Sequence, residues 1–126
     1  MLTDKVVFPA VAARDLNRAK AWYKDKLGMS PSKEIPDGVI YVCADGSALM
    51  LYQSPFAGTA KNTVAGWRVN DLESEMAQLR SRGVTFEEYD MPHVKTTDGV
   101  ADAPTLGVRG AWFSDSEGNI LVLSEI

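Results

Sequence analysis

Apolar residues recur at helical spacing early in the chain. Four of them, at successive offsets of 3, 4 and 4 residues, fall on one face of a helix: Leu16, Ala19, Tyr23 and Leu27. Asp15 precedes this stretch and can accept hydrogen bonds from the free amides of a first helical turn, and Gly28 can end the helix. The pattern predicts a helix between these two residues.

The same arrangement returns in the second half of the chain. Asp71 lies 56 residues after Asp15, an apolar face of Leu72, Met76 and Leu79 follows it, and Gly83 takes the place of Gly28. We therefore expect a second helix that copies the first.

Short runs of apolar and β-branched residues surround both predicted helices and favour strands. Two pairs of runs flank glycine-containing turns, around Asp45-Gly46 and around residues 115–118, and are expected to form hairpins. The predicted strands cover residues 6–13, 39–43, 48–53, 63–69, 84–89, 109–114 and 119–125.

Two copies of one strand–helix–strands unit predict an α+β fold with a pseudo-twofold axis. We divide the chain into module 1 (residues 1–54), a linker (residues 55–62) and module 2 (residues 63–126). Because 126 residues are few for two independent cores, we expect residues 1–126 to form a single domain.

The repeat is unequal in one place. The hairpin glycines Gly46 and Gly118 lie 72 residues apart, so module 2 carries about 16 additional residues, and residues 91–108 absorb them. This segment holds the only histidine, His93, and has no clear periodicity. It is either a loop that borders a ligand site or a surface loop without a role.

Composition excludes several classes of function. A net charge of −4 without a basic stripe argues against nucleic acid as a partner. No apolar run approaches the length that spans a membrane, and the N-terminus lacks a signal-peptide pattern, so we expect a cytoplasmic protein. The lone Cys43 excludes a disulfide within the chain and is expected to be a small buried side chain.

Two segments carry a family resemblance. Residues 15–29, DLNRAKAWYKDKLGM, and residues 112–121, WFSDSEGNIL, resemble the vicinal-oxygen-chelate superfamily, which includes glyoxalases, bleomycin-resistance proteins and extradiol dioxygenases. The resemblance implies two βαβββ modules that form a cupped mixed sheet with helices on its outer face and a ligand pocket inside. It also implies a homodimer, and exposed strand edges would favour one.

The resemblance further implies where catalytic members hold a metal: seven residues before each helix-opening aspartate and four residues after each hairpin glycine. In this chain those positions are Phe8, Met50, Val64 and Val122. Phenylalanine and valine offer no lone pair, and a thioether suits hard or borderline ions poorly. We therefore predict no metal and no other cofactor. A displaced metal site would need donors such as Asp90, His93 and Glu125.

The same four residues, if they face the pocket, define its wall. Period-two alternation adds Tyr52 and Arg68, although Arg68 could equally pair with Glu125 or Asp90 in a structural role. Trp112 either lines the pocket or packs under the sheet, and Trp22 and Trp67 are expected in the core. The candidate ligand-binding residues are Phe8, Met50, Tyr52, Val64, Arg68, His93, Trp112 and Val122.

No arrangement of nucleophile and base is recognisable in the sequence, and no phosphate-binding glycine loop is present. The sequence favours a metal-free protein that binds an apolar or aromatic small molecule and could sequester it. The alternative is a glyoxalase-like lyase or a dioxygenase-like enzyme whose metal site is relocated or absent.

Overall fold

Each half of the chain folds as a strand, a helix and a further set of strands. The computed structural model describes residues 1–103 and 107–126. The first half consists of β1 (Ala10–Ala13), α1 (Leu16–Leu27), β2 (Lys33–Ile35), β3 (Gly38–Val42) and β4 (Ala48–Gln53). The second half consists of β5 (Thr63–Val69), α2 (Leu72–Ser81), β6 (Thr96–Thr97), β7 (Val100–Ala103), β8 (Val108–Ser114) and β9 (Ile120–Glu125). Short 3-10 turns lie at Leu2–Asp4 and Ala44–Gly46.

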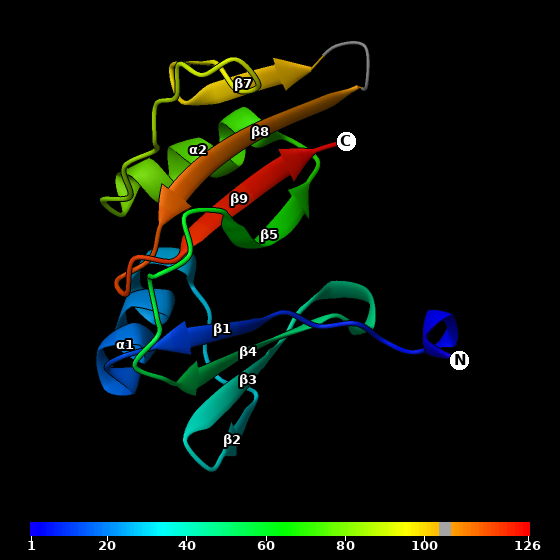
Figure 1. Cartoon of the computed structure of the whole chain (residues 1–126), viewed down its shortest axis with the longest axis vertical. Coiled ribbons are helices and arrows are strands. Elements are labelled where there is room, and N and C mark those ends of the chain that lie inside the picture. Colours follow the sequence, from blue (N-terminus) through cyan, green and yellow to red (C-terminus); the bar gives the residue numbers. More distant parts are fainter. Residues whose placement is uncertain (104–106) are drawn as a thin grey trace.

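The two halves form two mixed sheets that share one topology over four strands, and the second sheet adds β6 at its edge. The first has the order β1-β4-β3-β2 and the second β5-β9-β8-β7-β6, and among the strand pairs of the described residues only β1–β4 and β5–β9 are parallel. Figure 1 shows the first sheet in the lower half of the molecule and the second in the upper half. The predicted α+β fold of two βαβββ repeats is confirmed. Within the described residues, each module has its own sheet, and β1 and β5 are edge strands.

The helices begin where the sequence predicts. Asp15 Oδ1 accepts a hydrogen bond from the amide of Arg18 at 3.0 Å, and Asp71 Oδ1 accepts one from Ser74 at 3.1 Å. Gly28 ends α1 in the left-handed conformation, with φ at 68°. None of the helices in the described ranges is long and apolar enough to cross a membrane.

A second cap at each helix start reveals the repeat in more detail. The side-chain oxygen of Gln53, the last residue of β4, accepts from the amide of Leu16 at 3.3 Å. Glu125, the last residue of β9, does the same for Leu72 at 2.8 Å. In both modules the final strand therefore helps to fix the start of its own helix.

The structure corrects three predicted segments. Residues 6–9 precede β1 as an extension instead of forming part of the strand. Residues 84–89 form only an isolated bridge between Phe86 and Phe113, because Phe86 is held by packing on the core and not by a ladder of hydrogen bonds. The segment 91–108, expected to lack regular structure, contains β6 and β7, while residues 104–106 lie outside the described residues.

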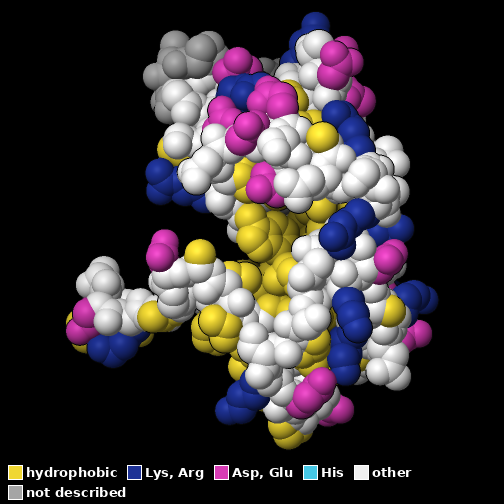
Figure 2. Space-filling view, turned by 180° about the vertical axis from the view of Figure 1, so that it is seen from behind, with side chains coloured by type: hydrophobic (Ala, Val, Ile, Leu, Met, Phe, Trp, Pro, Cys, Tyr) yellow, Lys and Arg dark blue, Asp and Glu magenta, His cyan; other side chains and the backbone are white. Residues whose placement is uncertain are grey.

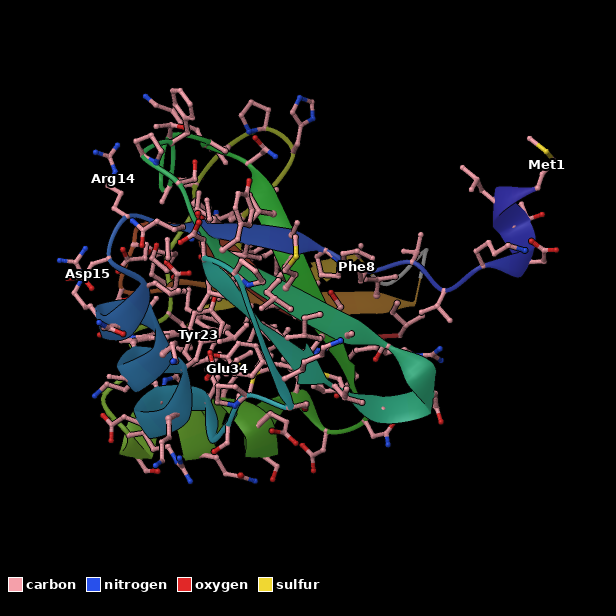
Figure 3. All side chains as sticks on the ribbon, turned by 90° about the horizontal axis from the view of Figure 1, so that it is seen from below. Met1, Phe8, Arg14, Asp15, Tyr23 and Glu34 are labelled. Atoms are coloured by element: carbon pink, nitrogen blue, oxygen red, sulfur yellow. The ribbon has the colours of Figure 1, made fainter. Side chains whose placement is uncertain are left out.

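Both modules contribute to one hydrophobic core. Phe113 of β8 stacks near Trp22 of α1, with ring centroids 6.4 Å apart, and near Trp67 of β5 at 6.5 Å. Trp22 and Trp67 pack against the core cluster, as predicted. The buried Tyr23 stacks on Tyr41 of β3 at 5.8 Å, and Figure 3 shows Tyr23 between α1 and the strands of its module. The predicted module boundaries and single domain stay predictions, which this shared core supports.

A polar network ties the hairpin between β8 and β9 to the first module. The buried carboxylate of Glu117 accepts hydrogen bonds from the Arg18 guanidinium, at 2.9 and 3.0 Å, and from the amide of Asp15 at 2.9 Å. The hydroxyl of Tyr23 donates to Asp115 at 2.8 Å. The hairpin thus holds α1 at its start and along its buried face.

Asn119 extends this network to β1 and to the linker. Its side-chain amide donates to the carbonyl of Ala12 at 2.8 Å, and its Oδ1 accepts from the amide of Gly58 at 3.2 Å. An added Cβ on Gly58 would lie 2.3 Å from the Glu117 carbonyl oxygen, so only glycine fits there. Asn119 therefore connects three segments of the chain: the β8–β9 hairpin, β1 and the linker.

We predict that Glu117→Gln destabilises the protein by about 1.5–3 kcal/mol, the range for a hydrogen bond to a charged group. The hydrogen bond from Arg18 is the main cause that lowers the pKa of Glu117 to about 2. The ordinary carboxyl pKa is 4.5, so the lowered pKa of Glu117 stabilises the folded state fully at pH values above 4.5. This stability is lost as pH falls toward 2.

Chemical denaturation of wild type and variant between pH 7 and pH 2 measures the effect, and the difference between them should shrink as pH falls. Glu34→Gln is the matched control, because the Glu34 pair with Lys20 is exposed and surface pairs contribute little. Equal losses in the two variants would contradict the role assigned to Glu117.

Candidate functional site

The five-stranded sheet has one buried face and one accessible face. On β8 and β9 the buried residues Ala111, Phe113, Leu121 and Leu123 join the core. The alternating residues point the other way, and we call the side that they form the open face. It is defined by Gly110, Trp112, Val122 and Ser124.

Trp112 occupies the middle of the open face. Its indole nitrogen donates a hydrogen bond to the hydroxyl of Thr63 on β5 at 3.0 Å. Its ring meets that of Tyr89 edge-on, with centroids 5.8 Å apart and an angle of 79°. The sequence left open whether Trp112 lines a pocket or packs under the sheet; it lies on the accessible side.

Two cavities adjoin Trp112. The first, of about 300 Å³, lies over the β7–β8 side of the sheet, and the second, of about 240 Å³, lies toward the start of β5. Three residues line both cavities: Met91, Val94 and Trp112. Trp112 is therefore a wall that the two cavities share.

The segment 91–94 crosses above this wall, and we call it the strap. The amide of Met91 donates to the carbonyl of Val94 at 2.9 Å, and that of Val94 donates back to Met91 at 3.3 Å. The buried Thr96 anchors the strap, since its hydroxyl accepts from the amide of Tyr89 at 2.7 Å and donates to Glu88 at 2.9 Å. The strap is thus a tightly bonded turn at the border of both cavities.

The first cavity carries its charge at the margin. His93, Lys95 and Asp102 are exposed residues among its lining, whereas Gly110, Ser124 and Trp112 form its base. In the second cavity, Tyr89 is part of the lining. Its pKa is raised, mainly by burial and secondly by the nearby Glu87. The arrangement places the Trp112 ring in the base of the first cavity and the charged groups at its edge.

The structure separates the candidate residues between the two sheets. Trp112 and His93 line the first cavity, and Val122 lies on the open face over Gly66, where an added Cβ would be 2.4 Å from Val122 Cγ1. Val64 packs against the core cluster instead, because the β5–β9 register shifts between Thr63 and Ala65. Thr63 takes the place on the open face that alternation assigns to Val64.

Three other candidates belong to the first module. Met50 and Tyr52 are half-buried on β4 and alternate with the core residues Leu49 and Leu51. Phe8 is 54% exposed at the root of the N-terminal extension, as Figure 3 shows. None of these three lines the cavities beside Trp112.

Arg68 lies away from the two cavities beside Trp112. Glu125, one of its suggested partners, pairs with Arg109 at 3.2 Å. Arg68 instead lines a groove of about 280 Å³ between the modules, together with Cys43 and Trp67. Figure 2 shows hydrophobic side chains gathered in a hollow between the upper and lower parts of the molecule. Cys43, expected to be buried, is half-buried at this groove because it follows the end of β3.

The residues at the implied metal positions do not fit a metal. Their side chains are apolar or, for Met50, a thioether, and Val64 packs on the core. Among the described residues, three carboxylates lie close enough to hold an ion: Asp71, Glu73 and Glu125. Arg109 pairs with Glu73 and Glu125, and Asp71 caps α2, so these groups already have partners.

Sequence reasoning missed Thr63, Tyr89 and Gly110, which surround Trp112. The bulge in β5 hides Thr63 from a simple alternation, and Tyr89 comes from a segment predicted to be a strand. Gly110 could have been noted as a glycine inside a strand pattern, which often marks a close approach.

Comparisons with known proteins agree with this fold. The chain resembles the structure of a glyoxalase/bleomycin resistance protein from Catenulispora acidiphila DSM 44928, with 24% identity, 96% of this chain and 97% of the other covered, and a TM-score of 0.67. TnmS3, an antibiotic binding protein from Streptomyces sp. CB03234, shares 21% identity over 99% and 98% of the chains with a TM-score of 0.68.

A bleomycin resistance determinant encoded on the transposon Tn5 shares 20% identity over 96% and 97% of the chains, with a TM-score of 0.71. The search of curated proteins gave no match. The model of the Glyoxalase/Bleomycin resistance protein/Dioxygenase superfamily matches residues 5–123. The chain therefore belongs to the glyoxalase/bleomycin resistance protein/dioxygenase superfamily.

Proposed function

We propose that this protein binds an apolar or aromatic small molecule beside Trp112 on the open face, without a metal. The observation that carries the proposal is the position of Trp112 as the shared wall of two cavities of about 300 and 240 Å³. An accessible indole offers a large flat surface, and clefts that combine an aromatic wall with a few polar groups are typical of ligand sites.

The polar margin of the first cavity would orient the ligand. His93 and Lys95 are hydrogen-bond donors and Asp102 is an acceptor, so a ligand with a polar group at one end can satisfy that group there while its apolar part stays against Trp112. The exposed charges stay hydrated until the ligand arrives. The proposed site therefore needs no catalytic group to explain its composition.

Two of the similar structures support sequestration as the biological purpose. One is described as an antibiotic binding protein and the other as a bleomycin resistance determinant. At 21% and 20% identity these two structures support the fold. The cytoplasmic location stays a prediction from the sequence.

We further propose a homodimer. Residues 1–8 project from the body, as Figures 1 and 3 show, and expose Leu2, Val6, Val7 and Phe8. β5 is an edge strand beside the groove that Trp67 lines, so it leaves backbone groups and apolar surface available. An extension from a second copy would cover this edge and bury its own apolar side chains.

In such a dimer, the candidate residues of the first module would contribute to the ligand site. Phe8, Met50 and Tyr52 do not line the Trp112 cavities of their own chain. An edge-to-edge meeting of β1 of one copy with β5 of the other would place the first module's sheet beside the second copy's open face. We propose that these residues, with Val122, then extend the ligand site.

Ligand binding should depend on Trp112. We predict that wild type binds 2-naphthoate, a flat aromatic probe, and that Trp112→Ala weakens binding at least about tenfold through loss of stacking. Isothermal titration calorimetry measures both. Phe56→Ala is the control, since Phe56 is an exposed aromatic residue on the linker. Equal affinity in wild type and Trp112→Ala would contradict the proposed site.

Elemental analysis separates binding from the enzymatic alternative. Protein purified without chelator should hold no stoichiometric Zn, Mn, Fe, Ni or Mg, because the implied ligand positions lack donors. One metal per chain that is lost in His93→Ala or Glu125→Gln would support a relocated catalytic site and overturn the metal-free proposal.

The dimer is tested by sedimentation equilibrium. Wild type should have about twice the 13.7 kDa chain mass, and Phe8→Asp should shift it toward monomer, since a charge buried at an interface is costly. Phe56→Asp, which changes an aromatic residue that is 75% exposed elsewhere, should leave the dimer intact. A monomeric wild type at micromolar concentration would refute the assembly.

A further inference from the structure

The orientation of Trp112 is fixed from both ends of its indole. At the nitrogen end, the hydrogen bond to Thr63 Oγ1 is 3.0 Å long. At the other end, the six-membered ring reaches over Gly110: a Cβ built there would lie 3.2 Å from Trp112 Cη2 and 3.6 Å from Cζ2 and Cζ3. Tyr89 adds an edge contact at 5.8 Å.

Glycine at position 110 makes room for the Trp112 ring and is not required by the backbone conformation. It is buried within β8, pairs with Ser124 of β9 and Ala101 of β7, and is not among the glycines with positive φ. Alanine could therefore adopt the same backbone conformation. Its methyl group would press on Trp112, so the absent side chain leaves the space that the ring needs.

Thr63 reaches Trp112 because of the bulge in β5. The register shift between Thr63 and Ala65 leaves Thr63 opposite Ile120, which lines the second cavity. Its hydroxyl thereby lies on the same face as the indole nitrogen. Without the extra residue, the side chain of Thr63 would point toward the other face of the sheet.

We propose that Thr63 and Gly110 are positioning residues that hold Trp112 at one angle and thereby restrict the ligand to flat groups. The inference rests on the proposed function. With Trp112 fixed, each cavity is a space of set width between the indole and the strap, because Met91 and Val94 border both. A flat ring can enter such a space against the indole, whereas a globular group of equal size requires the wall to turn.

The test compares two carboxylate probes with the same charge and number of carbon atoms: flat 2-naphthoate and globular 1-adamantanecarboxylate. Calorimetry should give a clear preference of wild type for the flat probe. Thr63→Val, which keeps the shape but removes the acceptor, should reduce that preference by about three- to tenfold, corresponding to one lost hydrogen bond. Thr63→Ser should retain it.

Gly110→Ala should reduce the preference in the same direction and alter the near-ultraviolet circular dichroism band assigned to Trp112 by difference from Trp112→Phe. If Gly110→Ala does not fold, the comparison of Thr63→Val with Thr63→Ser tests the inference by itself. Tight, Trp112-dependent binding with the same flat-to-globular ratio in wild type, Thr63→Val and Thr63→Ser would overturn this inference and leave the proposed function standing. A wild type that binds neither probe would overturn both.

Discussion

The packing of Phe113 constrains both faces of the five-stranded sheet. Its ring lies among Trp22, Trp67 and Phe86, so it joins α1 of the first module to β5 and the segment before the strap in the second. Successive side chains on a strand point to opposite faces. Burying Phe113 therefore forces Trp112 onto the open face, and the position of the candidate ligand wall follows from the core.

The hairpin after Phe113 explains why the two modules hold together in one chain. Asp115, Glu117 and Asn119 are buried polar residues, and each finds its partners across the repeat. A buried carboxylate is tolerated only when it is paired and hydrogen-bonded. Arg18 and the start of α1 meet that requirement for Glu117, so removing the Arg18 guanidinium would leave a buried carboxylate short of hydrogen bonds.

The sequence was sufficient to predict those features that depend on local periodicity. Both helices with their aspartate caps, the β3–β4 and β8–β9 hairpins and the core role of Trp22 and Trp67 all follow from spacing and turn residues. Val64 shows where prediction from periodicity fails. A one-residue bulge reverses which side chain reaches the open face, and no single-sequence pattern marks the bulge.

Tertiary packing also decided the segments that were predicted incorrectly. Phe86 has a strand-like sequence around it, yet it meets Phe113 through one bridge and a ring contact. The additional residues of module 2 look irregular because β6 and β7 are short, and Thr96, not periodicity, anchors the strap. Which sheet carries each candidate residue depends on these long-range contacts.

The repeat makes the difference between the two sheets informative about function. The modules share helix caps, and Gln53 and Glu125 occupy equivalent ends of β4 and β9, so the scaffold is retained in both copies. Trp112, Thr63 and the strap occur only in the second. At the implied metal positions, by contrast, both copies are alike in lacking strong metal donors. A pair of similar scaffolds with a single aromatic wall offers one flat face to a ligand and no symmetric set of donors to an ion.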